Sequence, residues 1–455
     1  MILSTQMTPP NATPYRVGTL LYSKAGLIAL FGWLLWGDFV FVLMTAIYPA
    51  LMPVLLKDHG ASNWEVMIIA TTLHTIMNAL VNPVVSYKSD QCRSRWGRRR
   101  PFIIVTTPFV VLFLALIPFA PEISRHLSSL SVFAWLFSLG PVAPMILTFG
   151  FLAVGFQFFD LFVGSVYYYL IPDVVPAQFI GRFIGLFRMV GAGAGIVFHY
   201  FIFGHAESHM KLIFVSIALL YGICILLMCA RVKEGEYPPI PQESKKSAWN
   251  GVMKYAKECF GHRYYWWAFF TYSASGWGAV GGVFAVFFFR DELGFSLELI
   301  GKTTAWSSAI FIIAAYPFGV LLDRWGCHKT LISSFAILTL SSVFMFFFAV
   351  DKSSGVAWLL VRNLAQAFCI MALGKWTVEV YPRERYGQFG SAGALFSSLG
   401  ATLLAPACAW WIDAMKEYRF LLVWSFLFTA AGVFAAIKVY RQWKVLGGPH
   451  SYQAP

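Results

Sequence analysis

The chain alternates between long apolar runs and short polar or charged breaks. A helix that crosses a bilayer needs about 20 mostly apolar residues, so the charged and Gly/Pro-rich breaks mark the ends of candidate spans. Twelve spans are predicted, at residues 27–56, 65–87, 101–119, 142–171, 180–203, 212–230, 265–289, 299–322, 328–349, 356–378, 388–412 and 419–438. The stretch 121–144 is too broken for another span, and we expect a short interfacial helix there.

The composition agrees with this pattern. Of the 455 residues, 58% are hydrophobic and 12% charged, and the mean hydropathy is +0.67, whereas a soluble domain carries roughly 25% charge. The chain is therefore a membrane protein. Its seven cysteines are scattered without metal-ligand spacing, and no nucleotide, zinc or catalytic-triad motif is present, so we expect a protein that is not an enzyme and binds no cofactor. The first twenty residues do not resemble a removable signal peptide.

The net charge of +13 would suggest a nucleic-acid partner in a soluble domain. Here the cations lie in short segments between apolar runs, which is the positive-inside pattern. They concentrate in the even-numbered loops, so both termini are expected in the cytoplasm. The prediction is a multi-pass monomer of the cell inner or plasma membrane, in contact with lipids and with no nucleic acid.

The chain divides into two halves. A polar, Pro-containing stretch separates six spans from six, which predicts a bundle at 1–230, a cytoplasmic linker at 231–264, a bundle at 265–440 and a cytoplasmic tail at 441–455. The segment "SYKSD" after the second span corresponds to "GVLLD" after the eighth, and each is followed by a Trp-Gly pair and cations. The fold class predicted is an all-α membrane protein with twelve helices in two six-helix pseudo-repeats, which is typical of secondary transporters.

Two loops carry a family resemblance. "GVLLDRWGCHK" is similar to the loop signature of the major facilitator superfamily, G-x-x-x-D-R-x-G-x-x-K. "SDQCRSRWGRRRPFI" resembles the glycoside-pentoside-hexuronide cation symporters and, among them, the sucrose-proton symporters. The resemblance implies a gating role for Asp90, Arg98, Arg99, Asp323 and Arg324. From its chemistry, Asp90 suits hydrogen bonds from a neighbouring helix N-terminus; the alternative is that the arginines only fix topology.

Charges inside spans are costly and therefore mark functional candidates. Asp38, Asp160 and Arg188 lie within the first, fourth and fifth spans. "FGWLLWGDF" resembles the first-span motif of melibiose-type permeases, which implies that Asp38 binds sugar. In that family a fourth-span aspartate thirteen residues before a loop acid also binds sugar, and Asp160 stands thirteen residues before Asp173. Arg188 matches the fifth-span arginine of the same family. Carboxylates and guanidinium groups form paired hydrogen bonds with vicinal hydroxyls. The alternative is a structural Asp-Arg pair buried between helices.

An aromatic platform for the sugar ring is not obvious. Gly164 stands where the resembled family has a fourth-span tryptophan. Tyr168, Trp33 and Trp36 are the candidates to replace it. The seventh span carries no charge, unlike that of the sucrose symporters, so the identity of the sugar stays open.

The coupling ion is predicted from the second span. Asn78 and Asn82 stand where the resembled family has two acids, and neutral amides disfavour sodium because hard cations prefer carboxylate oxygens. A proton is then the expected ion. Asp160 is the first candidate carrier, because a carboxyl group removed from water holds a proton more readily. His74 is the rival, since the ordinary pKa of histidine is about 6.5.

The function predicted is a secondary active transporter, a symporter of a proton with a disaccharide or glycoside. Two alternatives remain: a non-transporting assembly factor or receptor with this fold, and a proton-driven exporter of an amphipathic compound. Outside the candidate site, we expect His199 to be a packed residue, and Lys375 to pair with Glu379 one turn away.

Overall fold

The computed structural model describes residues 15–128, 142–237, 255, 257–382 and 385–455. Helices dominate these residues, and the strands β1 (Tyr15–Val17) and β2 (Leu20–Tyr22) form one antiparallel hairpin. The expected interfacial helix is present in part as α5 (Ala120–Ser128). The rest of the stretch 121–144 lies largely outside the described residues.

The first half of the chain forms six long helical segments, several of them extended by short 3₁₀ or π turns. They are α1 (Lys24–Asp58), α2 (Asn63–Met67) with η1 (Ile68–Thr72) and α3 (Leu73–Gln91), α4 (Arg100–Leu116) with η2 (Ile117–Phe119), α6 (Ala143–Val174), η4 (Ala177–Phe179) with α7 (Ile180–Val197), η5 (Phe198–Ile202) and η6 (Phe203–His205), and α8 (Ala206–Arg231).

The second half repeats this arrangement. Its elements are α10 (Arg263–Gly278) with η7 (Val280–Phe284), α11 (Ala285–Phe287) and η8 (Phe288–Glu292), then α12 (Leu297–Trp325), α13 (Cys327–Phe348), α14 (Lys352–Val380), α15 (Tyr386–Met415), η10 (Tyr418–Phe420) with α16 (Leu421–Val445), and α17 (Gly448–Ser451).

The predicted spans are confirmed. Eleven helical segments of the described residues are long and apolar enough to cross a membrane. One of them, Ala177–Arg231, has 55 residues, about 80 Å of helix at 1.5 Å per residue, which suffices for two crossings. It contains the expected fifth and sixth spans and bends at His209, whose backbone is not helical.

Local sequence explains where several helices begin. The Ser23 hydroxyl accepts a hydrogen bond from the backbone N–H of Gly26 and caps α1. Ser62 and Glu65 form a reciprocal capping box at the start of α2, which satisfies N–H groups that no helical carbonyl can reach. Gly326 separates α12 from α13 with a φ of 83°, a left-handed conformation that glycine adopts without steric cost.

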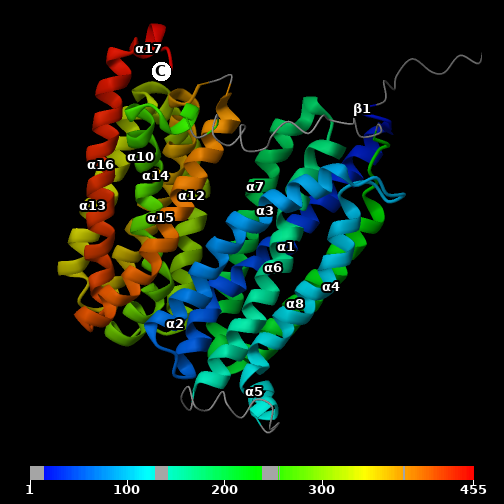
Figure 1. The fold of residues 1–455 in the computed structure, drawn as a ribbon. Coiled ribbons are helices and arrows are strands. Elements are labelled where there is room, and N and C mark those ends of the chain that lie inside the picture. Colours follow the sequence, from blue (N-terminus) through cyan, green and yellow to red (C-terminus); the bar gives the residue numbers. More distant parts are fainter. Residues whose placement is uncertain (1–14, 129–141, 238–254, 256, 383–384) are drawn as a thin grey trace, which may run out of the picture.

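The two halves touch at one end only, as far as the described hydrogen bonds show. We call the end that carries residues 92–99 the arginine end. At the opposite end Asn63 donates to Asp413, Tyr418 donates to Asn63, and Arg290 pairs with Asp58. In Figure 1 the helices of the two halves meet near α2 and diverge toward the end that carries β1 and α17. The conformation is therefore closed opposite the arginine end.

Candidate functional site

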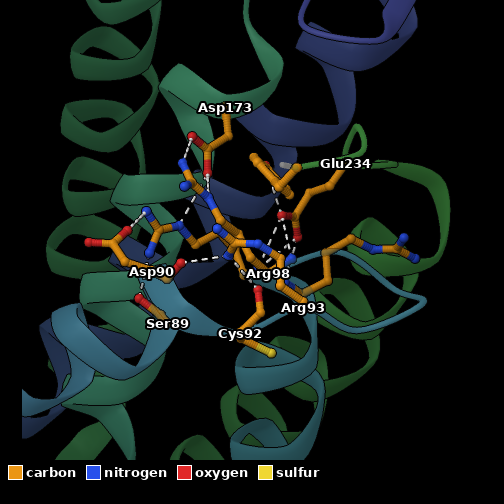
Figure 2. Close-up of polar contacts among 10 residues, drawn as sticks. Ser89, Asp90, Cys92, Arg93, Arg98, Asp173 and Glu234 are labelled. Atoms are coloured by element: carbon orange, nitrogen blue, oxygen red, sulfur yellow. Dashed lines mark hydrogen bonds and ion pairs between the residues drawn. The ribbon is translucent and has the colours of Figure 1, made fainter. Parts of the chain in front are cut away.

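Two arginines of the loop between α3 and α4 bind acids on two different helices (Figure 2). The Arg98 side chain forms a two-bond ion pair with Asp173 near the end of α6. Arg99, which is 5% exposed, reaches Asp173 at 3.1 Å, Asp90 at 2.5 Å and the hydroxyl of Ser89 at 2.5 Å. These arginines thus form a partly buried network of ion pairs, and fixing the topology would not require these specific contacts.

A helix N-terminus near this network is occupied by an acid, but by Glu234 and not by Asp90. The Glu234 carboxylate accepts hydrogen bonds from the backbone N–H groups of Arg98 at 2.9 Å, Arg99 at 3.0 Å and Arg100 at 2.7 Å. It belongs to the stretch that follows α8, and Figure 2 shows it reaching into the loop. A carboxylate at the start of α4 is favoured by the helix dipole.

Tyr237 completes this contact from the same stretch. Its hydroxyl donates to Glu234 at 3.1 Å, and the Arg98 guanidinium lies 4.3 Å from its ring centre. Burial, together with the nearby acids Glu234 and Asp173, raises the pKa of Tyr237. The sequence alone does not indicate a role for Glu234 or Tyr237, because a polar linker gives no local sign of a partner more than a hundred residues away.

The second half carries a simpler contact at the corresponding place. Asp323, at the end of α12, accepts a hydrogen bond from Lys375 on α14 at 2.6 Å. We expected Lys375 to pair with Glu379 on its own helix, but its ion-pair partner is Asp323 on α12. Arg324 lies exposed beside it. In this conformation, each half thus pairs the acid of its loop motif, Asp90 or Asp323, with a cation of the same half.

Two acids inside the first half have buried carboxylate oxygens without a hydrogen-bond partner among the described residues. Asp38 is 1% exposed, and neither of its carboxylate oxygens has a hydrogen-bond partner among the described residues. Oδ1 of Asp160 is likewise buried and unsatisfied. Buried polar atoms are nearly always satisfied in folded proteins, so these two side chains are available for a ligand or a proton.

Tyr168 lies close enough to interact with both acids, and Arg188 with Asp38. Arg188 interacts electrostatically with Asp38 across the contact between α1 and α7, yet no ion pair joins them among the described side chains. The buried Asp-Arg pair held as an alternative is therefore absent from this conformation. Tyr168 interacts electrostatically with Asp38, Asp160 and Arg188, and it is 43% exposed. The structure brings these four predicted residues together.

The two tryptophans proposed as platforms have other contacts in this conformation. The Trp33 ring lies under the Arg231 guanidinium at 5.9 Å, and Trp36 stacks on Phe39 with ring centres 5.8 Å apart. Tyr168 packs edge-on against Phe41 and Phe187, while part of its side chain stays accessible.

The amides of α3 satisfy one another. Asn82 donates to the side-chain carbonyl of Asn78, and the Ser165 hydroxyl on α6 donates to the side-chain carbonyl of Asn82. His74, one turn from Asn78, is exposed. This cluster contains no carboxylate, so it offers a sodium ion only neutral oxygens.

Two further polar residues lie in the second half and at the interface. Arg362 on α14 donates to the hydroxyls of Ser342 at 2.8 Å and Ser425 at 3.1 Å. It was missed, although an arginine within "LLVRNLAQAF" is a charge inside a predicted span.

His199, expected to be packed, lines a 210 Å³ cavity between the halves with Asn363, and its Nδ1 has no partner among the described residues.

The comparisons with known proteins give a family and a fold. The family model of the Major Facilitator Superfamily matches residues 34–405. The sucrose transport protein SUT5 of Oryza sativa subsp. japonica is 42% identical over 52 residues, which are 11% of this chain and 10% of that protein. The chain thus matches only about a tenth of this curated relative.

Solved structures resemble this one along nearly their whole length. A bacterial homologue of the iron transporter ferroportin, in an inward-facing state, aligns with a TM-score of 0.63 at 13% identity and covers 91% of this chain and 99% of its own. A D-xylose-proton symporter aligns with a TM-score of 0.60 at 14% identity, over 92% of this chain and 97% of its own. At these identities the likeness shows the fold alone.

Proposed function

This chain belongs to the major facilitator superfamily, and from that premise we propose that it moves a sugar or glycoside across the membrane together with a proton. The family and the fold make it a multi-pass membrane transporter. The observation that carries the finer proposal is the pair of acids Asp38 and Asp160 near Tyr168. Among the described residues, both carboxylate oxygens of Asp38 and Oδ1 of Asp160 are buried without a hydrogen-bond partner.

The chemistry of this group suits a polyhydroxylated solute. Carboxylates accept hydrogen bonds from vicinal hydroxyls, the guanidinium of Arg188 donates to their oxygens, and the phenol of Tyr168 does both. The accessible ring of Tyr168 also offers an apolar face to a sugar ring. The short stretch shared with a sucrose transport protein supports the same substrate class.

The chemistry of Asp160 and its surroundings favours a proton as the coupling ion. A charged side chain in the middle of a bilayer costs several kcal/mol, and Asp160 has no ion-pair partner among the described residues. Protonation removes that cost. The neutral cluster of Asn78, Asn82 and Ser165 supports the same choice, because it lacks the carboxylates that sodium favours. His74 stays the rival carrier.

The conformation supports transport by alternating access. If the arginine end is cytoplasmic, as the positive-inside rule indicates, both termini lie in the cytoplasm and the protein is open inward. The loop contacts of Asp90, Arg98, Arg99, Asp323 and Arg324 then lie at the end that must close when the protein opens outward. We place the protein in the cell inner or plasma membrane as a monomer.

Uptake into proteoliposomes under an inward proton gradient tests this proposal. Wild-type protein should accumulate at least one member of a panel of labelled mono- and disaccharides, and Asp38→Asn should abolish accumulation. Glu236→Gln, which changes an exposed acid outside the spans, is the matched control. A panel in which no sugar accumulates with the wild type would refute the sugar assignment.

The two alternatives give different results in the same assay. A receptor or assembly factor would bind a sugar, seen as a rise in unfolding temperature, without gradient-driven flux. An exporter of an amphipathic compound would be driven by a proton gradient of the opposite orientation.

A further inference from the structure

The loop motifs of the two halves differ at two aligned positions. After the shared Trp-Gly pair the first half has Arg98 and Arg99, and the second half has Cys327 and His328. The acid that binds the arginines is retained, since Asp173 is the next-to-last residue of α6 and Glu379 is the next-to-last residue of α14. The second half thus keeps the acid and replaces its two permanent cations by a thiol and an imidazole.

These three side chains converge at the arginine end of the second half. A sulfur of Cys327, a ring nitrogen of His328 and a carboxylate oxygen of Glu379 lie within 4.8 Å of one another. Cys327 is 0% and His328 4% exposed. All three line a cavity of 1240 Å³ that also reaches Lys375 and Tyr381, so water has access to the cluster.

The imidazole of His328 has one engaged and one free nitrogen. The indole N–H of Trp376 donates to Nδ1 at 3.0 Å, while Nε2 is buried and has no partner among the described residues. The centre of the imidazole ring lies 5.2 Å from that of Tyr440 and 4.4 Å from that of Trp443. Because Nδ1 accepts, Nε2 carries the ring proton of the neutral imidazole, and a buried polar atom without a partner is unusual in a folded protein.

We propose that Cys327, His328 and Glu379 form a binding site for a divalent cation of the zinc type. Thiolate, imidazole and carboxylate are the ligands that Zn²⁺ prefers, and a water from the cavity supplies the fourth position of a tetrahedron. Binding releases the thiol proton, and the charges of thiolate and carboxylate balance those of the metal. The ion would join the start of α13 to the end of α14, as Arg98, Arg99 and Asp173 join α4 to α6.

Trp376 competes with the metal for His328. A neutral imidazole that binds a metal through one nitrogen carries its proton on the other. If the metal binds Nδ1, it takes the place of the Trp376 N–H. If the metal binds Nε2, the ring proton moves to Nδ1, and Nδ1 can then no longer accept a hydrogen bond from Trp376. Either way the bond from Trp376 is lost, so its removal should strengthen metal binding.

Metal titration of the full chain tests the site. Purified protein in detergent, freed of metal with a chelator, is titrated with Zn²⁺ in competition with a chromophoric chelator, and with Co²⁺ to observe the thiolate-to-cobalt charge-transfer band. Cys327→Ser should weaken Zn²⁺ binding about 100-fold, at the upper end of the losses seen for altered metal sites, and abolish the cobalt band. Cys259→Ser, another buried thiol at this end, should leave both unchanged.

Trp376→Phe gives an independent result even if Cys327→Ser fails to fold. We expect it to bind Zn²⁺ more tightly than the wild type, because the competing donor is gone and the ring stays apolar. A wild type without a thiolate-to-cobalt band would overturn the site. Zn²⁺ affinity that is equal in wild type and Cys327→Ser, or unchanged in Trp376→Phe, would overturn it as well.

Discussion

The carboxylate of Glu234 lies 2.7 Å from the backbone nitrogen of Arg100 and accepts its hydrogen bond. This contact joins the stretch between the halves to the start of α4, across 134 residues of chain. The same stretch is fixed from its other side, because the backbone N–H of Glu236 donates to the Thr19 hydroxyl in the hairpin of β1 and β2. The first part of the linker is therefore attached to the first half at the arginine end.

Removal of the Glu234 carboxylate should destabilise this end. Glu234→Ala leaves three N–H groups at the start of α4 without their acceptor, and loss of a capping side chain costs about 1–2 kcal/mol. We expect a lower unfolding temperature in detergent, measured by intrinsic fluorescence. Glu236→Ala, whose contact is made by the backbone, should unfold like the wild type; an unshifted Glu234→Ala would contradict the cap.

Asp90→Asn should slow transport more than it weakens substrate binding. The Asp90 side chain is 58% exposed and binds Arg99, which keeps Asp173 as a second partner. Asp90 lies at the end of α3, whereas Asp38 and Asp160 lie within α1 and α6. We expect a reduced turnover rate in proteoliposomes with a nearly unchanged dissociation constant by thermal shift. An unchanged turnover rate at equal expression would remove the gating role.

Asp160→Asn should abolish proton-driven accumulation, because the amide cannot carry a proton across the cycle. Exchange of substrate down its own gradient should persist, and added sodium should not stimulate the wild type. The measurement is counterflow compared with gradient-driven uptake in the same vesicles.

The comparison variant is His74→Gln. If it loses the pH dependence of uptake while Asp160→Asn retains it, His74 is the carrier. Sodium stimulation of the wild type would instead indicate a cation site that includes Asn82, and the proton assignment would fall.

The C-terminal residues 452–455 are held on the second half by hydrogen bonds with Val380 and Tyr265. We call this contact docking, and it should weaken at high pH. The Tyr452 hydroxyl donates to the carbonyl oxygen of Val380 at 2.7 Å, and burial raises its pKa to about 12 from an ordinary value of about 10. The docked phenol stays protonated where the free phenol ionises. Docking is therefore unaffected below pH about 10 and weakens as the pH rises to about 12.

A spin label at Gln453→Cys reports this release through its mobility. The label should become more mobile over that pH range in the wild-type background. With Tyr452→Phe added, mobility should not change there, since the ionising group is absent; a matching transition in both proteins would assign the effect to another residue.

The sequence was sufficient for the spans and for part of the site. The length of an apolar run determines whether it can cross the membrane, and this length can be read from the sequence. The fifth and sixth spans were therefore recognisable although the helix bends at His209. Asp38 and Asp160 were recognisable because a charge in an apolar run is locally conspicuous. Arg362 carries that same signal, and applying the rule to every span would have found it.

Other features depend on pairing that no local pattern contains. Glu234 lies in a polar stretch where an acid is ordinary, and only the fold shows that it reaches α4. Trp33 and Trp36 looked equivalent to Tyr168 by residue type, yet helix rotation turns Trp33 toward Arg231. His199 was judged by its apolar neighbours, whereas its cavity is made by both halves together.

Asn63 donates one hydrogen bond, to Asp413, and accepts another, from Tyr418. Its NH₂ group faces a carboxylate and its carbonyl oxygen faces a phenol, so only an amide in one orientation satisfies both neighbours. An aspartate of equal size would place two like charges together and convert an attraction into a repulsion. A single change of this kind would shift the population toward the shape that is open at the end opposite the arginine end, and would supply a genetic means of trapping it.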